Sequence, residues 1–532
     1  MNRKRTEVKD VAEYTPMMQQ YLKTKEEYKD CILFYRLGDF YEMFFDDAIV
    51  VSKELELTLT GKSCGAEERA PMCGVPYHAV EGYLNKLVAN GHKVAICEQV
   101  EDPKLAKGLV KREVIRIVTP GTNTDMQALD ESKNNYIMCI VYLADKYGIS
   151  LADISTGDYF VTEVDTERKL IDEINKFAPS EIICNESFYM SGVDLSDMKN
   201  RLGIAVYSLE AWYFSDETAE NTLKEHFKVQ SLEGLGLSDY ACGTIAAGAL
   251  LRYLYETQKN DLGNLSAIHP YSTGKYMIID SSTRRNLELV ETLREKQKRG
   301  SLLWVLDKTK TAMGARTLRA YVEQPLIDKT EIELRQEAIG ELNDHVITRE
   351  ELREYLNPIY DLERLITRVT YRTANPRDLI AFKNSISMLP PIKSLLDEFD
   401  GALLKNIQND IDTGRNNQIY QWMASITDRL QNSNKDIVHD NTHRPCKICT
   451  EIHNRFREHV RRSSHQYQDL WCQKHSQNCQ HSTGHKSKCN RCMDCLLQAV
   501  SFFGSVISCN NNTCTHGNAV NKTYHQKNQI SR

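Results

Sequence analysis

The chain has 532 residues, of which 41% are hydrophobic and 26% are charged, and its formal net charge is −6. This length is enough for three or four domains, and the composition is typical of a soluble globular protein. No apolar run approaches the roughly 20 residues that a membrane-spanning helix needs, and the first 20 residues lack the apolar core of a secretory signal. The sequence therefore predicts a cytoplasmic protein with no membrane partner.

Charge, cysteine and histidine are unevenly distributed along the chain. Residues 431–532 hold 14 basic against 6 acidic side chains, a net charge of +8, which leaves a net charge of −14 for residues 1–430. The same C-terminal stretch holds nine of the 16 cysteines and ten of the 15 histidines. Because the larger part of the chain is acidic, overall charge does not favour a nucleic-acid partner, and any DNA contact must come from local patches.

The first predicted element is a helix that begins with Thr15 at the N-cap and Pro16 at the first helical position. Residues 31–45, with the sequence CILFYRLGDFYEMFF, follow it. They form an apolar run, a turn at Gly38 and Asp39, and a second apolar run. This pattern predicts two strands joined by a tight turn.

The second of these strands carries an aromatic ring beside a carboxylate. If Tyr41, Met43 and Phe45 face the core, then Phe40 and Glu42 lie together on the other face, because residues two apart share a face of a strand. A ring can stack on a nucleobase, and a carboxylate can accept a hydrogen bond from a base edge. From spacing alone, a buried ring beside a solvated acid is the commoner arrangement.

The remainder of the first 122 residues alternates helical and extended patterns. Asp46 and Asp47 head a helix, where acids suit the positive end of the helix dipole. Residues 58–63, TLTGKS, end like a phosphate-binding loop, but Glu56 stands where the first glycine of that loop belongs, so this stretch indicates a turn. An amphipathic helix that stops at Asn90-Gly91 and two further strands complete a predicted mixed α/β domain.

Several of these stretches resemble the MutS family of DNA mismatch-repair proteins: TPMMQQYLKTKEEY (15–28), GDFYEMFFDDA (38–48) and APMCGVPYHA (70–79). In that family the Phe of an F-x-E motif wedges beside a mispaired base and the Glu hydrogen-bonds to that base. The matching positions here are Phe40 and Glu42. The resemblance also implies DNA contacts by Lys62, in a loop that approaches the minor groove, and by Pro71 and Met72.

Residues 135–164 predict three strands joined by tight turns, and strands then alternate with helices to about residue 240. This pattern resembles the connector domain of the MutS family, which has a ribonuclease-H-like fold. Asp153 lies on one of the three strands, and such folds often hold metal-binding carboxylates there. No set of four acids accompanies Asp153 on the right strands, so we predict a structural role for it.

The next part of the chain is predominantly helical in pattern. Residues 240–258 predict an apolar core helix with close neighbours, and residues 275–280 predict a strand. Residues 300–325 predict a turn and two helices whose Lys and Arg line a solvated face, and residues 331–404 predict long helices. Residues 300–325 and 361–382 resemble the all-helical lever of the MutS family.

The family resemblance stops after residue 428, and the following stretch is rich in cysteine and histidine. Thiolate pairs with zinc-binding spacing are formed by Cys446, Cys449, Cys489, Cys492 and Cys495. Little periodic apolar structure surrounds these pairs to hold them in place. Two interpretations stay open: a tail produced by a shifted reading frame, or a zinc-binding interaction protein that acts through this tail.

The resemblance implies a multidomain protein that binds mismatched DNA in DNA mismatch repair. It comprises an α/β mismatch-recognition domain (1–122), an α/β ribonuclease-H-like connector domain (123–245), an incomplete all-α lever region (246–430) and an irregular Cys/His-rich tail (431–532).

The resemblance implies cofactors and partners as well. The family hydrolyses ATP, but no G-x-x-x-x-G-K-[ST] loop occurs in the 532 residues. We therefore expect ATP and Mg in the complete family protein, and no cofactor or catalytic residue in this chain. The implied partners are double-stranded DNA with mismatches or small loops, a MutL-type repair protein and, for the complete protein, a second copy in a homodimer. The implied location is the cytoplasm, at the nucleoid.

Overall fold

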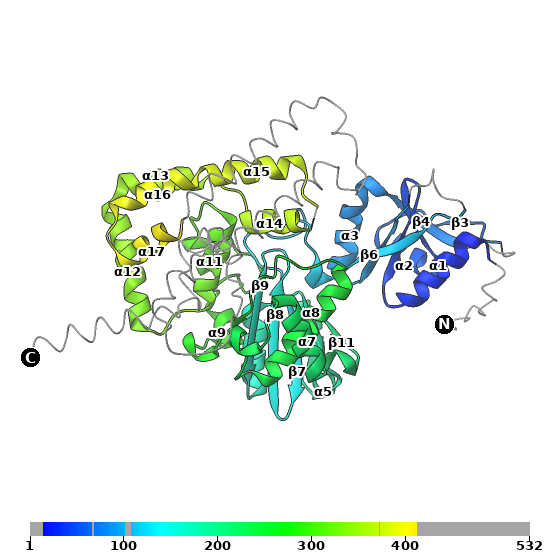
Figure 1. The fold of residues 1–532 in the computed structure, drawn as a ribbon, viewed down its shortest axis with the longest axis horizontal. Helices are drawn as coiled ribbons and strands as arrows, with labels where there is room; N and C mark the ends of the chain where they lie inside the picture. The colour runs from blue at the N-terminus through cyan, green and yellow to red at the C-terminus, as the bar shows by residue number, and fades with distance from the viewer. Residues whose placement is uncertain (1–13, 66–68, 102–107, 372, 412–532) are drawn as a thin grey trace, which may run out of the picture.

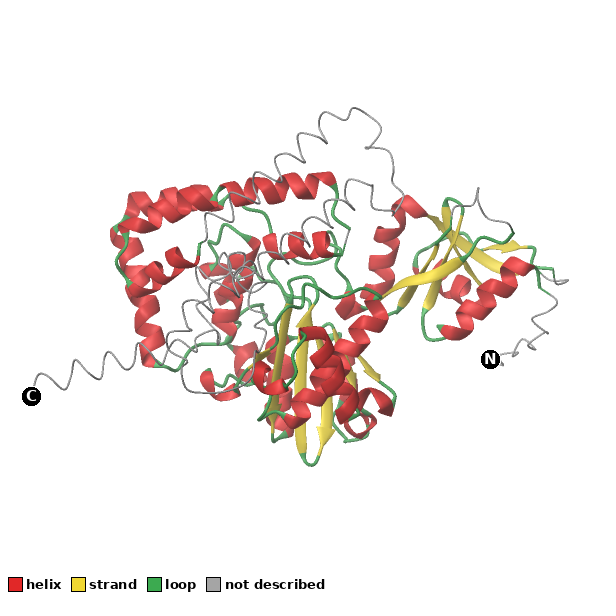
Figure 2. Ribbon diagram, viewed as in Figure 1, coloured by secondary structure: helices red, strands yellow, loops and turns green. Residues whose placement is uncertain are grey.

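The computed structural model describes residues 14–65, 69–101, 108–371 and 373–411. Within these residues the chain forms three units (Figure 1), two of which contain a six-stranded sheet. Figure 2 shows that the strands lie in the first two units, whereas the third consists of helices and loops. None of the helices in these residues is long and apolar enough to cross a membrane.

The first unit is a sheet covered by helices on both faces. Its strand order is β3-β4-β2-β1-β5-β6, and among these pairs only β1 and β5 run parallel. Helix α1 packs on one face, and α2 and α3 pack on the other. The elements are α1 (Pro16–Glu27), β1 (Ile32–Leu37), β2 (Phe40–Phe44), α2 (Phe45–Glu54), β3 (Thr60–Lys62), β4 (Ala70–Pro76), α3 (Val80–Ala89), β5 (Val94–Gln99) and β6 (Arg112–Val118).

The local predictions for this unit are confirmed with two corrections. Helix α1 has Thr15 at its N-cap and Pro16 in its first turn, and α3 ends with Asn90 as its C-cap. The stretch TLTGKS is not only a turn, because residues 60–62 pair with β4 as an edge strand. Phe45 does not continue the alternation of β2, since it begins α2 with a φ of +54°.

The second unit contains the sheet β11-β10-β7-β8-β9-β12. Strands β7, β8 and β9 form an antiparallel meander, and β10 runs parallel to both β7 and β11. Helices α7 and α8 cover one face (Figure 1), and α4, α5 and α6 pack on the other. The elements are β7 (Ile137–Leu143), β8 (Lys146–Asp153), β9 (Asp158–Val164), α4 (Glu167–Phe177), β10 (Glu181–Cys184), α5 (Glu186–Tyr189), α6 (Leu195–Leu202), β11 (Ala205–Ser208), α7 (Asp216–Phe227), α8 (Ala241–Gln258) and β12 (His269–Pro270).

Helix α8 is the core helix that its Ala- and Gly-rich sequence predicts. A Cβ added at Gly248 would lie 2.3 Å from the Cα of Ala219 on α7, and one added at Gly148 on β8 would lie 2.2 Å from the backbone of Cys242 on α8. Helix and sheet backbones therefore approach more closely than any side chain allows. The predicted domain boundary at residue 245 falls inside this helix.

The third unit is built from helices of 5 to 16 residues. Helices α12 to α17 share one apolar core. The elements are α9 (Ser281–Asn286), α10 (Leu302–Leu306), α11 (Ala312–Glu323), α12 (Lys329–Asp344), α13 (Val346–Leu356), α14 (Leu362–Thr370), α15 (Pro376–Ser387), α16 (Leu389–Leu395) and α17 (Ala402–Asp410). The strand predicted for residues 275–280 is wrong: only Tyr276 makes a β-bridge there, to Leu326, because no strand of the described residues lies beside the rest to pair with it.

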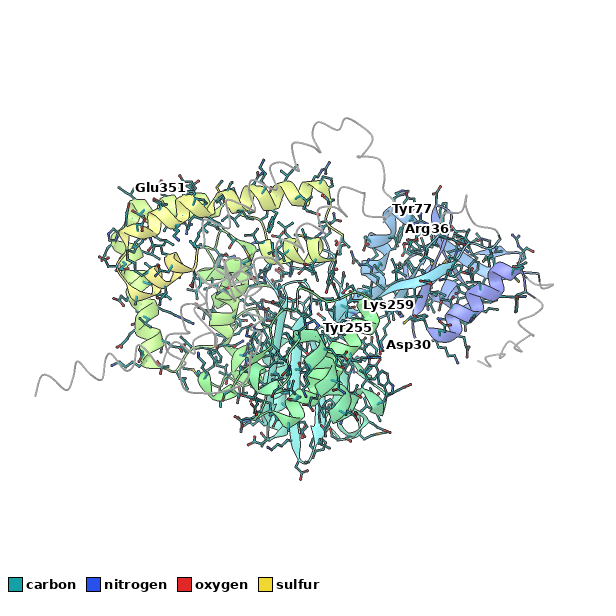
Figure 3. The ribbon with its side chains drawn as sticks, in the orientation of Figure 1. Asp30, Arg36, Tyr77, Tyr255, Lys259 and Glu351 are labelled. Carbon is teal, nitrogen blue, oxygen red and sulfur yellow. The ribbon has the colours of Figure 1, made fainter. Side chains whose placement is uncertain are left out.

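The first unit is joined to the second by contacts on a buried carboxylate. Glu181, at the start of β10, is fully buried and accepts hydrogen bonds from the Thr119 hydroxyl, from the Gly121 N–H at 3.0 Å and from the Tyr253 hydroxyl at 2.7 Å. At the C-cap of α8, the ammonium of Lys259 lies 5.6 Å from the centre of the Tyr28 ring, where the two units meet (Figure 3). These contacts tie the end of the first sheet to the second sheet.

Two buried arginines of the third unit hold the 130–135 segment, which leads from the first unit into β7. Arg316 on α11 donates to the carbonyl of Glu131 at 2.9 Å, and Arg364 on α14 donates to the carbonyl of Lys133 at 2.7 Å. We call Arg316 and Arg364 with their acidic partners the arginine clamp. The expectation that the basic residues of 300–325 line a solvated face is therefore wrong for Arg316, which is only 6% exposed.

The acidic partners of the clamp come from the start of α14. Arg316 makes a bidentate pair with Asp361, at 2.7 and 2.8 Å, and also contacts Glu363 at 2.6 Å. Burial raises the pKa of Glu363 to about 7 despite this arginine. A charge cluster buried in this way persists only if every member keeps its partners.

We predict that Arg316→Met destabilises the fold, because it leaves Asp361 and Glu363 buried without a cation. Removing one partner of a buried ion pair costs about 3–5 kcal/mol. Urea unfolding is expected to show this loss, and hydrogen exchange is expected to speed up across the 130–135 segment. The matched control is Lys329→Met, which removes a lysine that is 86% exposed in its pair with Glu333. Equal, small effects of the two substitutions would contradict the clamp.

Candidate nucleic-acid interface

The β1–β2 hairpin is held by contacts around its two-residue turn. Leu37 pairs with Phe40 across Gly38 and Asp39, and Gly38 adopts a φ of +59°, which glycine tolerates without strain. The Tyr77 N–H donates to the Asp39 carbonyl at 2.9 Å. The Arg36 guanidinium lies 3.9 Å from the centre of the Tyr77 ring, and Figure 3 shows the two side chains next to each other.

Strand β2 presents its two faces as the alternation predicts. Tyr41 and Met43 are fully buried on the face covered by α2 and α3. On the opposite face, Phe44 is buried under α1, where its ring packs against Tyr21 at a centroid distance of 4.9 Å. Farther along the same face, Phe40 is 46% exposed. Helix α1 therefore covers Phe44 at one end of this face of β2 and leaves the ring of Phe40, at the other end, in solvent.

Glu42 lies between these two rings on the same face and is paired with a lysine. Its Oε2 is 2.5 Å from Nζ of Lys62, and the two side chains are 17% and 32% exposed. Gly74 of β4 stands directly opposite Glu42 in the sheet. The sequence resemblance implies Phe40 and Glu42 as the mismatch-binding pair and Lys62 as a separate DNA contact, and in the structure Lys62 contacts Glu42.

Pro71 and Met72 occupy the neighbouring edge of the same sheet. In the β3–β4 pair, Gly61 lies opposite Pro71 and Thr60 lies opposite Met72. The Thr60 hydroxyl donates to the Met72 carbonyl at 3.1 Å. Both Pro71 and Met72 are half-buried; Met72 lies on the face that carries Lys62 and Phe44, and Pro71 lies on the opposite face.

A buried aspartate, Asp47, anchors the hairpin, and this role was not predicted from the sequence. Asp47 was expected only to complement the dipole of α2. Its carboxylate instead accepts the Leu33 N–H at 3.0 Å and pairs with Lys25 at 2.9 Å, and it is 8% exposed. Burial raises the pKa of Asp47, against the opposing effect of Lys25. The helical spacing of Ala48, Val51 and Leu55 was the available signal, because it places Asp47 on the buried face of α2.

A second cluster fixes the opposite face of β2. The Tyr41 hydroxyl donates to Glu98, and Arg36 lies 3.5 Å from the same carboxylate. Burial and then the charge of Glu98 raise the pKa of Tyr41, so this phenol stays a donor at neutral pH. The strand that carries Phe40 is thus held from beneath by hydrogen bonds as well as by apolar packing.

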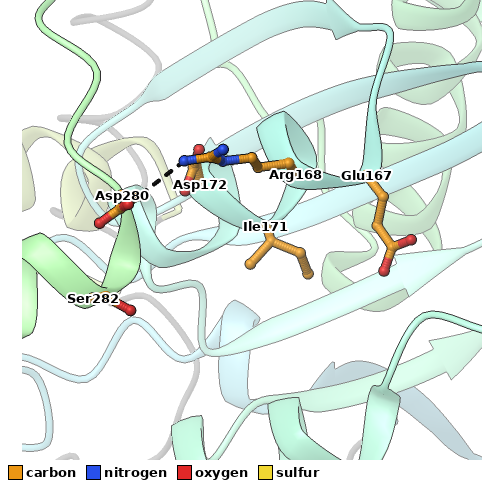
Figure 4. Close-up of a pocket in the computed structure, with 6 residues that line it drawn as sticks. All are labelled: Glu167, Arg168, Ile171, Asp172, Asp280 and Ser282. Atoms are coloured by element: carbon orange, nitrogen blue, oxygen red, sulfur yellow. Dashed lines mark ion pairs between the residues drawn. The ribbon is translucent and has the colours of Figure 1, made fainter.

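A shallow hollow lies where the second and third units meet, and the second unit also holds a buried aspartate. The hollow, of about 410 Å³, lies between α4 and the start of α9, where Arg168 reaches toward Asp280 at 3.6 Å (Figure 4). Asp153 is fully buried and accepts hydrogen bonds from Asn134, from the Asn135 N–H and from Ser155. These contacts support the structural role that was predicted for Asp153.

The zinc candidates Cys446, Cys449, Cys489, Cys492 and Cys495 lie outside the described residues. Among residues 14–411, apart from the stretches not described, no group of three or more His, Cys, Asp or Glu side chains is placed to hold a metal ion. Nothing in the structure therefore bears on the zinc interpretation.

Comparison with known protein families gives three consecutive matches. The models named MutS domain I, MutS domain II and MutS domain III match residues 15–127, 135–266 and 282–481. The third match continues past residue 428, where the resemblance apparent in the sequence stops.

Curated proteins named DNA mismatch repair protein MutS are similar to this chain. The one from Lachnoclostridium phytofermentans is 68% identical over 402 residues, which are 76% of this chain and 43% of that protein. Those from Ruminiclostridium cellulolyticum and Acetivibrio thermocellus are each 52% identical, over 75% and 76% of this chain and 46% of each relative. The chain thus spans somewhat less than half the length of the curated relatives it matches.

We predict that Asp47→Asn loosens the hairpin, because the substitution removes the charge that holds Lys25 and weakens the acceptor of the Leu33 N–H. Loss of a charge-assisted hydrogen bond costs about 1.5–3 kcal/mol. Hydrogen exchange across residues 31–45 is expected to accelerate by at least about tenfold. The neighbouring, exposed Asp46 provides the control: Asp46→Asn is expected to leave this exchange unchanged. Equal exchange in both variants would show that Asp47 does not anchor the hairpin.

Proposed function

The chain belongs to the MutS family, and from that premise we propose that its first unit binds mismatched double-stranded DNA in DNA mismatch repair. The observation that carries this proposal is the exposed end of β2. There, the ring of Phe40 stands in solvent beside the half-buried carboxylate of Glu42. We propose that the three units correspond to the mismatch-recognition, connector and lever regions of the family.

Phe40 acts as the wedge in this proposal. Its ring projects from the end of a hairpin whose turn, strands and underside are all tied by hydrogen bonds. An apolar ring inserted at a base step unstacks that step and kinks the duplex. A mispaired base costs less to unstack than a Watson–Crick pair, so the same insertion is more favourable at a mismatch. Selectivity therefore comes from the deformability of the DNA.

Glu42 acts as the acceptor. It sits two residues from Phe40 on the same strand face, so a base displaced by the ring comes within reach of the carboxylate. A carboxylate accepts hydrogen bonds only, and it therefore favours a base edge that offers an N–H donor. Lys62 and Met72 lie on one face of the adjacent strands β3 and β4, with Pro71 at the same edge on the other face, and this edge approaches the minor groove.

The connector and lever units position the part of the first sheet that carries Phe40 and Glu42. The lever contacts the 130–135 segment through Arg316 and Arg364, so a displacement of the first unit acts directly on α11 and α14. In the complete family protein, we propose that ATP and Mg binding, a homodimer and a MutL-type partner complete the repair function. We place the protein in the cytoplasm, at the nucleoid.

We predict that Phe40→Ala abolishes the preference for mismatched DNA. The affinity for a duplex with one G·T pair is expected to fall by at least about fivefold, since stacking one base on an aromatic ring contributes about 1–3 kcal/mol. The affinity for the matched G·C duplex is expected to change little. Fluorescence anisotropy with the two duplexes measures both affinities.

The control for this experiment is Tyr189→Ala, which truncates a ring of nearly equal exposure, 45%, on α5 of the second unit. It is expected to leave both affinities unchanged. The fold of Phe40→Ala is checked by its unfolding curve, which should match that of the unaltered chain because the ring is exposed. A Phe40→Ala protein that still prefers the G·T duplex to the same degree would end the proposal.

A further inference from the structure

Lys62 and Glu42 come from strands that are not neighbours. Strand β4 lies between β3, which carries Lys62, and β2, which carries Glu42. Their contact at 2.5 Å therefore requires both side chains to reach across β4 on the same face of the sheet. Glu42 lies two residues from Phe40 on the surface that we assign to DNA, and Lys62 reaches it from the side of Phe44.

Gly74 leaves the space for this contact. It is the residue of β4 that lies opposite Glu42, and a Cβ added to it would stand 3.3 Å from the Tyr41 carbonyl and 3.5 Å from Cγ of Glu42. Without a side chain at this position, the Glu42 carboxylate can lean over β4. The ammonium of Lys62 lies 5.6 Å from the centre of the Phe44 ring, so it approaches Glu42 over a rigid aromatic surface.

We propose that Lys62 is a positioning residue that sets mismatch specificity by holding the carboxylate of Glu42. The inference rests on the function proposed above. Lys62 contacts Oε2, and a carboxylate has about four acceptor sites on its two oxygens. The pair therefore fixes the direction of the carboxylate and leaves acceptor capacity for a donor on the displaced base.

The lysine also makes the carboxylate compatible with DNA. A duplex carries one negative charge per about 1.7 Å of its axis, so an isolated carboxylate at its surface is repelled. A paired carboxylate brings no net charge and keeps its hydrogen-bonding function. Lys62 is then required for the contact that discriminates the mispair, and its effect depends on Glu42.

A simpler role for Lys62 makes a different prediction. If Lys62 only contacts a phosphate, its removal weakens binding to every duplex equally. The removal also reduces the magnitude of the slope of log K against the logarithm of the salt concentration by about one, because one fewer counterion is released on binding. A lysine that acts through Glu42 changes the ratio of mismatched to matched affinity. The two roles are separated by measuring that ratio with and without Glu42.

The experiment is a double-mutant cycle on the full chain, with a duplex containing one G·T pair and its matched G·C counterpart. We expect Lys62→Met to lower the affinity ratio by about fivefold, the scale of a partly exposed ion pair. In the Glu42→Gln background, the same substitution is expected to change the ratio by less than about twofold. Lys62→Arg keeps the charge and is expected to retain most of the ratio.

The control is Lys29→Met, which removes an exposed lysine from its pair with Glu26 on the far end of α1. It is expected to leave the ratio unchanged. A fall in both affinities at a constant ratio would make Lys62 a phosphate contact and overturn the inference, as would an equal loss of ratio with and without Glu42. An unaltered chain that shows no preference for the G·T duplex would overturn the proposed function, and this inference with it.

Discussion

The contact between two buried arginines and the 130–135 segment is the constraint on which the arrangement of the three units depends. Arg316 and Arg364 bind backbone carbonyls of the segment by which the first unit enters the second. Their acidic partners lie at the start of α14. One charge cluster therefore contacts the connection between the two sheets and two helices of the third unit. Because buried charges tolerate no partial rearrangement, the cluster favours movement of these parts together.

Helix α1 covers only part of one face of β2, and this decides which side chains the first unit presents to a ligand. On a single face of β2, α1 covers Phe44 and stops short of Phe40. The same strand is held from the opposite face by Tyr41, and the neighbouring strand β1 is held by the hydrogen bond from the Leu33 N–H to Asp47. The exposed ring is thus carried on a rigid base, and a rigid base is what a wedge requires, because a yielding one would bend before the base step opens. The proposed function needs no mobile element at this site.

Short-range features of this structure were predictable from the sequence, and long-range polar contacts were not. The alternation in residues 40–44 placed Phe40 and Glu42 on one face, and the 3-4 spacing of α3 identified its buried side. The pairing of Lys62 with Glu42 depends on the order of three strands and on a glycine between them, which no local pattern contains. Arg316 appeared to be a surface residue of an amphipathic helix, since its partners lie about 45 residues away. The strand expected at 275–280 failed because strand propensity without a neighbouring strand forms no sheet.

The most direct test of the account is whether this chain opens a mispaired base step. A G·T duplex with 2-aminopurine beside the mispair reports unstacking through increased fluorescence. The account predicts an increase when the unaltered chain binds, no increase with Phe40→Ala, and none on a matched duplex with the same probe. Tight, mismatch-selective binding without any increase in fluorescence would contradict the wedge, and recognition would then have to occur on a stacked duplex.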